Sequence, residues 1–170
     1  MSTSEYERST KMVRFDQLSM AMTEALAEHS ASRQLVLADD MPAWLTHNVN
    51  RPSTSILGKL FGSADAPDDN AGHSEHDVLV VLHTTHLVVV TTGQNRDAAA
   101  ISVPLAQASV RVGGALEDSF SAVEDSGVTI GGFPEGHGQA ETFYIGLGPE
   151  PAGAECAEAI RAAITDAKNP

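Results

Sequence analysis

The chain has one cysteine, 5% aromatic residues and no long apolar run, and each shortage excludes a class of protein. With Cys156 alone no internal disulfide can form, so we expect the reducing environment of the cytoplasm. No run approaches the roughly 20 apolar residues that a membrane-spanning helix needs. The first eleven residues, M-S-T-S-E-Y-E-R-S-T-K, lack the apolar segment of a secretory signal peptide.

Basic residues are also scarce. The chain has 10 Lys and Arg against 23 Asp and Glu, a formal net charge of −13. Between Gly62 and Ile160 only Arg96 and Arg111 are basic. Such a surface repels phosphates and anionic headgroups, which argues against nucleic-acid and stable membrane binding. The acidity is typical of a soluble protein, although a basic protein partner or a high-salt cytoplasm would also explain it.

Residues 77–93, D-V-L-V-V-L-H-T-T-H-L-V-V-V-T-T-G, contain two β-branched apolar runs around a short polar break. Valine suits a pleated strand better than a helix, so we predict a central β-hairpin. A two-residue Thr84-Thr85 loop would set three facing pairs: His83 with His86, Leu82 with Leu87, and Val80 with Val89. Because Thr-Thr suits a tight turn poorly, a longer turn in a shifted register stays open. Neither run alternates with polar residues, which predicts cover on both faces.

The rest of the chain divides around this hairpin. Residues 1–12 are polar and are predicted to be a flexible N-terminus, and 13–30 have the apolar spacing of an amphipathic helix. Residues 33–168 form the predicted domain, interrupted by an acidic loop at 63–77. At the C-terminal end a narrow apolar stripe predicts a capping helix: Cys156, Ile160, Ala163, Ile164 and Ala167.

Short antiparallel strands followed by one C-terminal amphipathic helix make a distinctive order, and it resembles the bacterial pleckstrin-homology-like (PH-like, GRAM-type) domains. Their second and third strands are similar to V-L-V-V-L-H-T-T-H-L-V-V-V, and I-S-V-P-L-A-Q-A-S-V-R-V stands where they carry an I-P-L stretch. Their last strands are similar to G-V-T-I and F-Y-I-G-L. The resemblance covers about residues 33–167.

This resemblance implies an α+β, mainly β fold. The expected form is an antiparallel barrel or half-barrel of about six or seven strands with a C-terminal capping helix, to which this chain adds an N-terminal helix. Two departures bear on function: His86 stands where these domains have a basic residue, and the acidic loop lies where lipid-binding members place basic contacts. Phosphoinositide binding is therefore not implied.

Histidine offers the sharpest chemical hypothesis. Four imidazoles follow H-x2-H-x6-H-x2-H and are candidate ligands of a divalent metal ion: His73, His76, His83 and His86. The alternative is a set of solvent-exposed histidines near a hairpin tip, because this spacing matches no known metal motif. No nucleophile motif, phosphate loop or carboxylate pair provides catalytic residues, so neither an enzyme nor a bound cofactor is expected.

The sequence thus predicts a non-enzymatic interaction module. It would bind a protein or peptide of unknown identity along an open sheet edge or beside the capping helix, and it could form a homo-oligomer. The alternative function is a metal or small-ligand sensor that uses the histidine-rich hairpin region.

Overall fold

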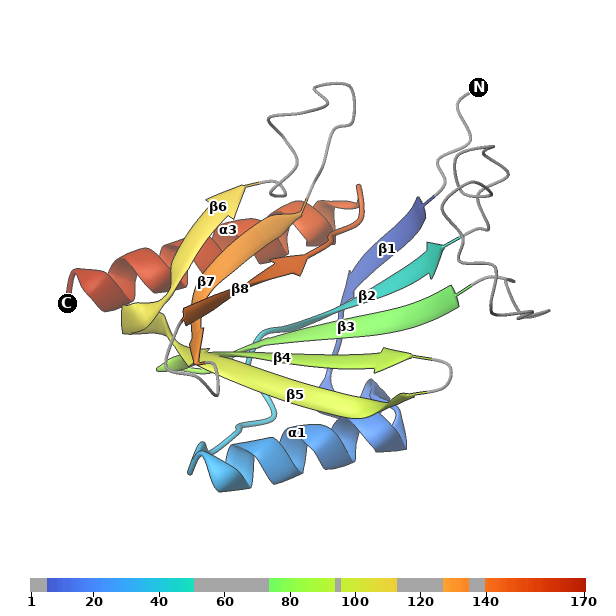
Figure 1. Ribbon diagram of the computed structural model, residues 1–170, viewed down its shortest axis with the longest axis horizontal. Helices are drawn as coiled ribbons and strands as arrows, with labels where there is room; N and C mark the ends of the chain where they lie inside the picture. Colours follow the sequence, from blue (N-terminus) through green and yellow to red (C-terminus); the bar gives the residue numbers. More distant parts are fainter. Residues whose placement is uncertain (1–5, 51–73, 94–95, 113–126, 135–139) are drawn as a thin grey trace, which may run out of the picture.

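The computed structural model describes residues 6–50, 74–93, 96–112, 127–134 and 140–170. They form an α+β structure in which strands predominate, with two antiparallel sheets (Figure 1). The five-stranded sheet has the order β1 (Tyr6–Met12), β2 (Ala43–Asn50), β3 (Ser74–Leu82), β4 (His86–Gly93) and β5 (Arg96–Pro104). The three-stranded sheet has the order β6 (Ser109–Val112), β7 (Val128–Pro134) and β8 (Ala140–Ile145).

The helices are α1 (Met20–Ser32) and α3 (Pro151–Lys168), with one-turn 3-10 helices at Phe15–Gln17 and Leu105–Gln107. Within the described ranges, no helix has the length and apolar content needed to cross a membrane.

The predicted central hairpin is confirmed in the shorter register. Leu82 lies opposite Leu87 and Val80 opposite Val89, and the His83 amide donates to the His86 carbonyl at 2.9 Å. Thr84 and Thr85 therefore form the two-residue turn, although the pair suits such a turn poorly. The buried strands on both sides fix the register, because a slip by one residue would turn every valine to the opposite face.

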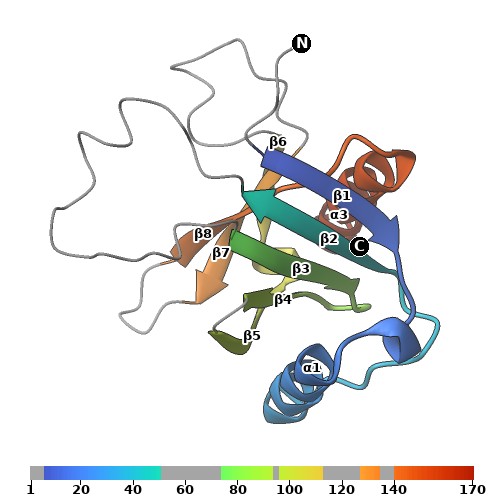
Figure 2. The same cartoon turned by 90° about the vertical axis from the view of Figure 1, so that its right-hand side faces the viewer.

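Both faces of the five-stranded sheet are covered, as the uninterrupted apolar runs predict. On one face α1 buries Leu79, Val81, Val88 and Val90 with Met22 and Leu26 (Figure 2). On the other face, Trp44, Val80 and Val89 pack against the three-stranded sheet and α3. The central strands thus contribute side chains to a core on each face, and the larger core lies between the five-stranded sheet and the three-stranded sheet with α3.

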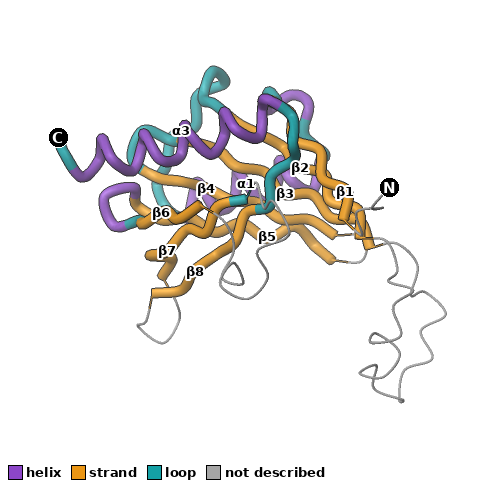
Figure 3. Tube along the Cα trace, turned by 90° about the horizontal axis from the view of Figure 1, so that it is seen from above, coloured by secondary structure: helices purple, strands orange, loops and turns teal. Residues whose placement is uncertain are grey.

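The predicted C-terminal helix is confirmed. Cys156, Ile160 and Ile164 are buried along one stripe, and Ala163 and Ala167 pack beside them. Pro151 begins the helix, where the missing amide costs no intrahelical hydrogen bond. The helix extends from β1 to β6 along one side of the molecule (Figure 3).

The N-terminal predictions need correction. Residues 6–12, predicted to be flexible, form β1, which pairs with β2 along its whole length. The helix predicted over 13–30 begins only at Met20, because Ser19 is its N-cap and accepts a hydrogen bond from the Met22 amide. Since β1 precedes it, α1 is no addition outside the domain but the connection between two neighbouring strands of one sheet.

Further features of the fold differ from prediction. The described residues contain eight strands rather than six or seven, because β1, which precedes residue 33, joins the five-stranded sheet. Ser74 to Asp77 belong to β3 rather than to the acidic loop, whose other residues, 63–73, lie outside the described part. Within the described ranges the strands pair as two sheets, with no pairing between the sheets that would close one barrel.

Candidate functional site

Polar side chains gather where the β3–β4 hairpin turns. The His83 and His86 rings meet edge to face, with centroids 6.1 Å apart. Thr85 links them, because its hydroxyl lies 3.0 Å from Nδ1 of His83 and 2.8 Å from Nδ1 of His86. The Thr85 amide also donates to Nδ1 of His83 at 3.1 Å. The hairpin tip is therefore a small hydrogen-bonded network.

A third histidine reaches this tip from α1. Nε2 of His29 and the hydroxyl of Ser102 on β5 share a hydrogen bond of 2.7 Å. Ser102 lies opposite Val88, which is on the face that α1 covers, and His86 is two residues earlier on β4. Side chains two residues apart on a strand share a face. We name His29, His83, Thr85, His86 and Ser102 the hairpin-end cluster.

Burial and neighbouring positive groups disfavour the protonated form of two imidazoles in this cluster. Burial lowers the pKa of His29 below its usual value, and the charges of Arg33 and His86 lower it further. Burial likewise lowers the pKa of His86, with His83 and Arg33 adding to the effect. Arg33, which follows α1, thus repels the protonated form of two imidazoles. Within the described residues Arg33 has no ion-pair partner.

The structure does not assemble the four predicted metal ligands. His83 and His86 are adjacent, but His76 lies at the other end of β3, about 20 Å away for seven residues of extended chain. His73 lies outside the described residues. Among the residues described, no three or more His, Cys, Asp or Glu side chains are placed to hold a metal ion.

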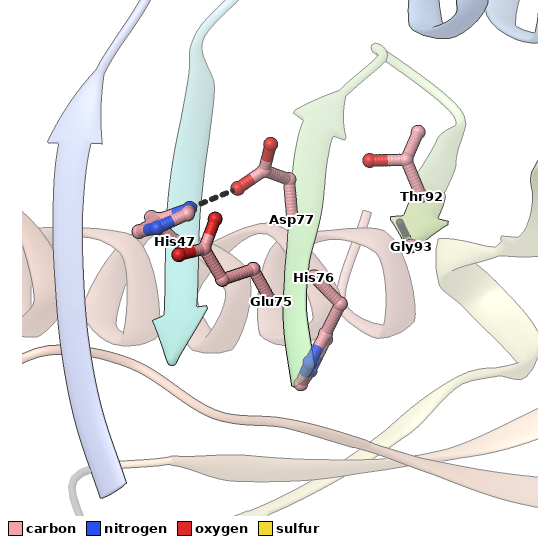
Figure 4. Close-up of a pocket in the computed structure, with 6 residues that line it drawn as sticks. All are labelled: His47, Glu75, His76, Asp77, Thr92 and Gly93. Atoms are coloured by element: carbon pink, nitrogen blue, oxygen red, sulfur yellow. Dashed lines mark hydrogen bonds and ion pairs between the residues drawn. The ribbon is translucent and has the colours of Figure 1, made fainter. Parts of the chain in front are cut away.

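A second polar group occupies that other end of the sheet. Nδ1 of His47 on β2 lies 2.6 Å from Oδ1 of Asp77 on β3, and Glu75 lies beside them (Figure 4). They line a shallow hollow of about 160 Å³ together with His76, Thr92 and Gly93. The side chain of His76 points away from the His47 and Asp77 pair (Figure 4).

This end also contains a row that resembles a catalytic triad in residue type. Ser9 lies opposite His47 on β1, and Asp77 lies opposite His47 on β3. Ser9 and His47, however, are exposed, and within the described residues the Ser9 hydroxyl makes no hydrogen bond to His47. Cys156 is fully buried, and burial raises the pKa of its thiol to about 12, so it is no nucleophile at neutral pH.

The two edges of the five-stranded sheet form the remaining candidates. The amide of Val13, just after β1, donates to the carbonyl of Ala43 on β2. Residues of an edge strand alternately pair with their neighbour and direct their backbone groups away from it, so the outward residues of β1 are Arg8, Thr10 and Met12. The Thr10 amide donates to Oε2 of Glu150 at 3.1 Å, and its hydroxyl accepts from the Gly148 amide at 2.8 Å. The segment before α3 therefore covers the β1 edge.

On β5 the corresponding groups are open. The amide of Leu105 donates to the carbonyl of Thr85. Every second residue before Leu105 therefore hydrogen-bonds β4, which includes Ile101 and Ala99. Ala100, between them, directs its amide and carbonyl away from the sheet. No described residue hydrogen-bonds the outward groups of Ala100, and β5 is the last strand of its sheet (Figure 1). We name residues 98–101 the open edge. The next residue, Ser102, is 5% exposed.

Comparisons with protein-family models, with curated proteins and with solved structures give no match. The chemistry available to this chain is therefore argued from its own residues. Sequence reasoning identified His83 and His86 but missed His29 and Ser102, which are 73 residues apart in the chain. Neither residue belongs to a local motif, so the sequence held no signal that joined them.

Proposed function

We propose that this chain is a non-enzymatic cytoplasmic interaction module that binds an extended segment of a partner protein along the open edge of β5. The observation that carries the proposal is the outward amide and carbonyl of Ala100 on a strand that, among the described residues, pairs with β4 alone. Such an edge is a template for strand addition, in which main-chain hydrogen bonds supply affinity.

The composition of the open edge supports this proposal. Residues 98–101 read A-A-A-I, with no charge, proline or large side chain to block an incoming strand. Edges that are not used for binding commonly carry such blocking residues. Ala99 is exposed and its neighbours Ala98, Ala100 and Ile101 are partly buried, so a partner strand would also cover apolar surface.

A PH-like architecture is part of the same proposal. The seven strands from β2 to β8 are followed directly by α3, in the order that the sequence resemblance implies. On this proposal β2 to β8 and α3 make up a PH-like barrel or half-barrel, and its first sheet is extended by β1, which α1 connects to β2. Peptide binding at a sheet edge is a use to which such folds are suited.

A proline scan at the two sheet edges tests the binding proposal. Ala100→Pro removes the outward amide of β5 and leaves the bonds between β5 and β4 intact. The matched control is Met12→Pro, which removes an outward amide on β1, where Met12 is 54% exposed. Each purified full-length variant would be used to select from a displayed library of random ten-residue linear peptides.

We expect wild type and Met12→Pro to retain the same peptides and Ala100→Pro to lose them. If wild type retains no peptide, or if Ala100→Pro binds the selected peptides as tightly as wild type, the open edge is not the binding site. Light scattering on the same samples identifies the occupant. A dimer that Ala100→Pro converts to a monomer would assign the edge to a second copy of the chain.

A metal sensor is the second candidate function, and the adjacent rings of His83 and His86 favour it. Two imidazoles alone leave the coordination sphere of a divalent ion incomplete. Metal analysis of the purified protein beside a His83→Ala/His86→Ala variant tests this function. Stoichiometric metal that the variant loses would support the sensor, and equal traces in both samples would reject it.

A further inference from the structure

Four side chains that can carry positive charge lie near one another beside the end of the open edge: His29, Arg33, His83 and His86. His29 reaches Ser102, only two residues after Ala100, and His86 and His83 follow on the neighbouring strands. Arg33 acts on both His29 and His86. In a chain of net charge −13, this concentration of cationic groups contrasts with the overall acidity.

The cationic groups have no counter-charge in the described structure. The charges that act on His29 come from Arg33 and His86, and those that act on His86 come from His83 and Arg33. The nearby part of β5, residues 100–104, is uncharged in sequence. Asp39 and Asp40 approach this end of the sheet on the segment before β2, but they are exposed and form no ion pair with Arg33.

We propose that the hairpin-end cluster and Arg33 form an anion site that receives a carboxylate side chain of the segment bound on β5. The inference rests on the proposed function and assigns the chemistry of its ligand. Arg33 supplies a permanent charge with a planar set of donors, and the imidazoles add donors whose charge increases as the pH falls.

The geometry limits where the carboxylate lies in the bound segment. Ala100 and Ser102 are about 7 Å apart on β5, so the acidic residue lies within a few positions of the residue that pairs with Ala100. Side chains of a strand alternate between faces, and only those on the α1 face point toward His29. One acidic residue at a fixed position, with no requirement at the adjacent position, is therefore expected among binding peptides.

The test uses the tightest peptide selected on wild type at pH 6.5, synthesised with its acidic residue as Asp or Glu and with the matching Asn or Gln. Fluorescence anisotropy gives the Kd of both forms for wild type, Arg33→Gln, His29→Gln and Ala100→Pro. Arg161→Gln is the charge-matched control, because Arg161 lies on α3 and pairs with Glu158. We expect the amide form to bind wild type about tenfold more weakly, and to bind Arg33→Gln with the same Kd as the acid form.

The outcomes separate this inference from the proposed function. Binding that Ala100→Pro abolishes, with equal Kd for acid and amide forms on wild type, would retain the open edge and overturn the anion site. An acid preference that persists in Arg33→Gln and His29→Gln would also overturn the site. Selected peptides that bind Ala100→Pro as tightly as wild type would overturn the proposed function itself. If Arg161→Gln weakens the preference for the acid form as much as Arg33→Gln does, the preference depends on net charge alone, and this result would contradict the site.

Discussion

At the β1 edge the outward amide of Thr10 donates to the Glu150 carboxylate, whereas at the β5 edge the outward amide of Ala100 has no hydrogen-bond acceptor among the described residues. Both strands belong to one sheet, and both direct alternate backbone groups away from it. They differ in what the rest of the chain places beside them. The segment before α3 covers β1, whereas no described segment hydrogen-bonds the outward groups of Ala100 on β5. On our proposal, a partner segment binds at that position.

The covered edge shows how closely this chain can pack against a strand. A Cβ on Gly148 would lie 2.9 Å from both the Arg8 carbonyl oxygen and the Thr10 nitrogen, so only glycine fits. Arg8 also donates to the Tyr144 hydroxyl at 3.1 Å and lies over the ring of Tyr144. Contacts this close require specific residues. The open edge, A-A-A-I, contains no glycine, arginine or tyrosine of the kind that forms the contacts at β1.

The largest expected effect is the difference in stability between losing an amide of β5 that pairs with β4 and losing one that points outward. Ala99→Pro removes an amide that pairs with β4 and should lower the free energy of unfolding by more than about 2 kcal/mol. Ala100→Pro removes an outward amide and should cost under about 1 kcal/mol. Urea unfolding of both variants measures the difference. Equal losses would mean that the assignment of inward and outward groups is wrong.

The next effect breaks the covered edge. Gly148→Ala forces a methyl group against the backbone of β1 and should destabilise the protein by about 1–3 kcal/mol. Gly146→Ala is the control, because its Cβ would meet the end of the Arg8 side chain, which can move. Thermal unfolding should rank the two variants in this order. A larger loss for Gly146→Ala would show that the β1 backbone is not packed against Gly148.

A smaller effect concerns pH. The hydrogen bond from the Thr10 amide lowers the pKa of Glu150, so its stabilising contribution is present above the ordinary glutamate pKa of 4.5 and is lost as the pH falls through the lower folded value. Glu150→Gln should remove this part of the acid sensitivity and change stability at pH 7 by about 1 kcal/mol or less. Urea unfolding between pH 7 and pH 3 measures both quantities. An unchanged pH profile in the variant would contradict the hydrogen bond between the Glu150 carboxylate and the β1 edge.

The smallest effect belongs to the open side. Because the pKa values of His29 and His86 are lowered in the folded protein, their contribution is present above the ordinary histidine pKa of 6.5 and declines as the pH falls below it. A His29→Gln/His86→Gln variant should show a shallower decline in stability between pH 7.5 and pH 5.5. The same slope in wild type and variant would contradict the lowered pKa values of His29 and His86.

The features that the sequence predicted well are local ones. The valine runs on either side of Thr84 and Thr85 contain their own strand signal, and the register then follows from burial on both faces. The stripe from Cys156 to Ile164 likewise lies within one helix. The sequence predicted for the same reason that His83 faces His86, since only a two-residue turn separates them.

The features that it missed depend on contacts between distant residues. The polar residues of β1 become a strand because β2 pairs with them across the whole of α1. The contact of Thr10 with Glu150 joins positions 140 residues apart, and no periodicity in either segment predicts it. His76 shows the opposite error: it is close to His83 in sequence, but the extended backbone of β3 places the two at opposite ends of the sheet.

Amide hydrogen exchange, resolved by residue, tests the contrast between the two edges most directly. In the free protein the Thr10 amide should exchange slowly and the Ala100 amide rapidly, and addition of a peptide selected on wild type should slow exchange at Ala100 and leave Thr10 unchanged. A protected Ala100 amide in the free protein, or no new protection at Ala100 when the peptide is bound, would contradict an open edge that accepts a strand.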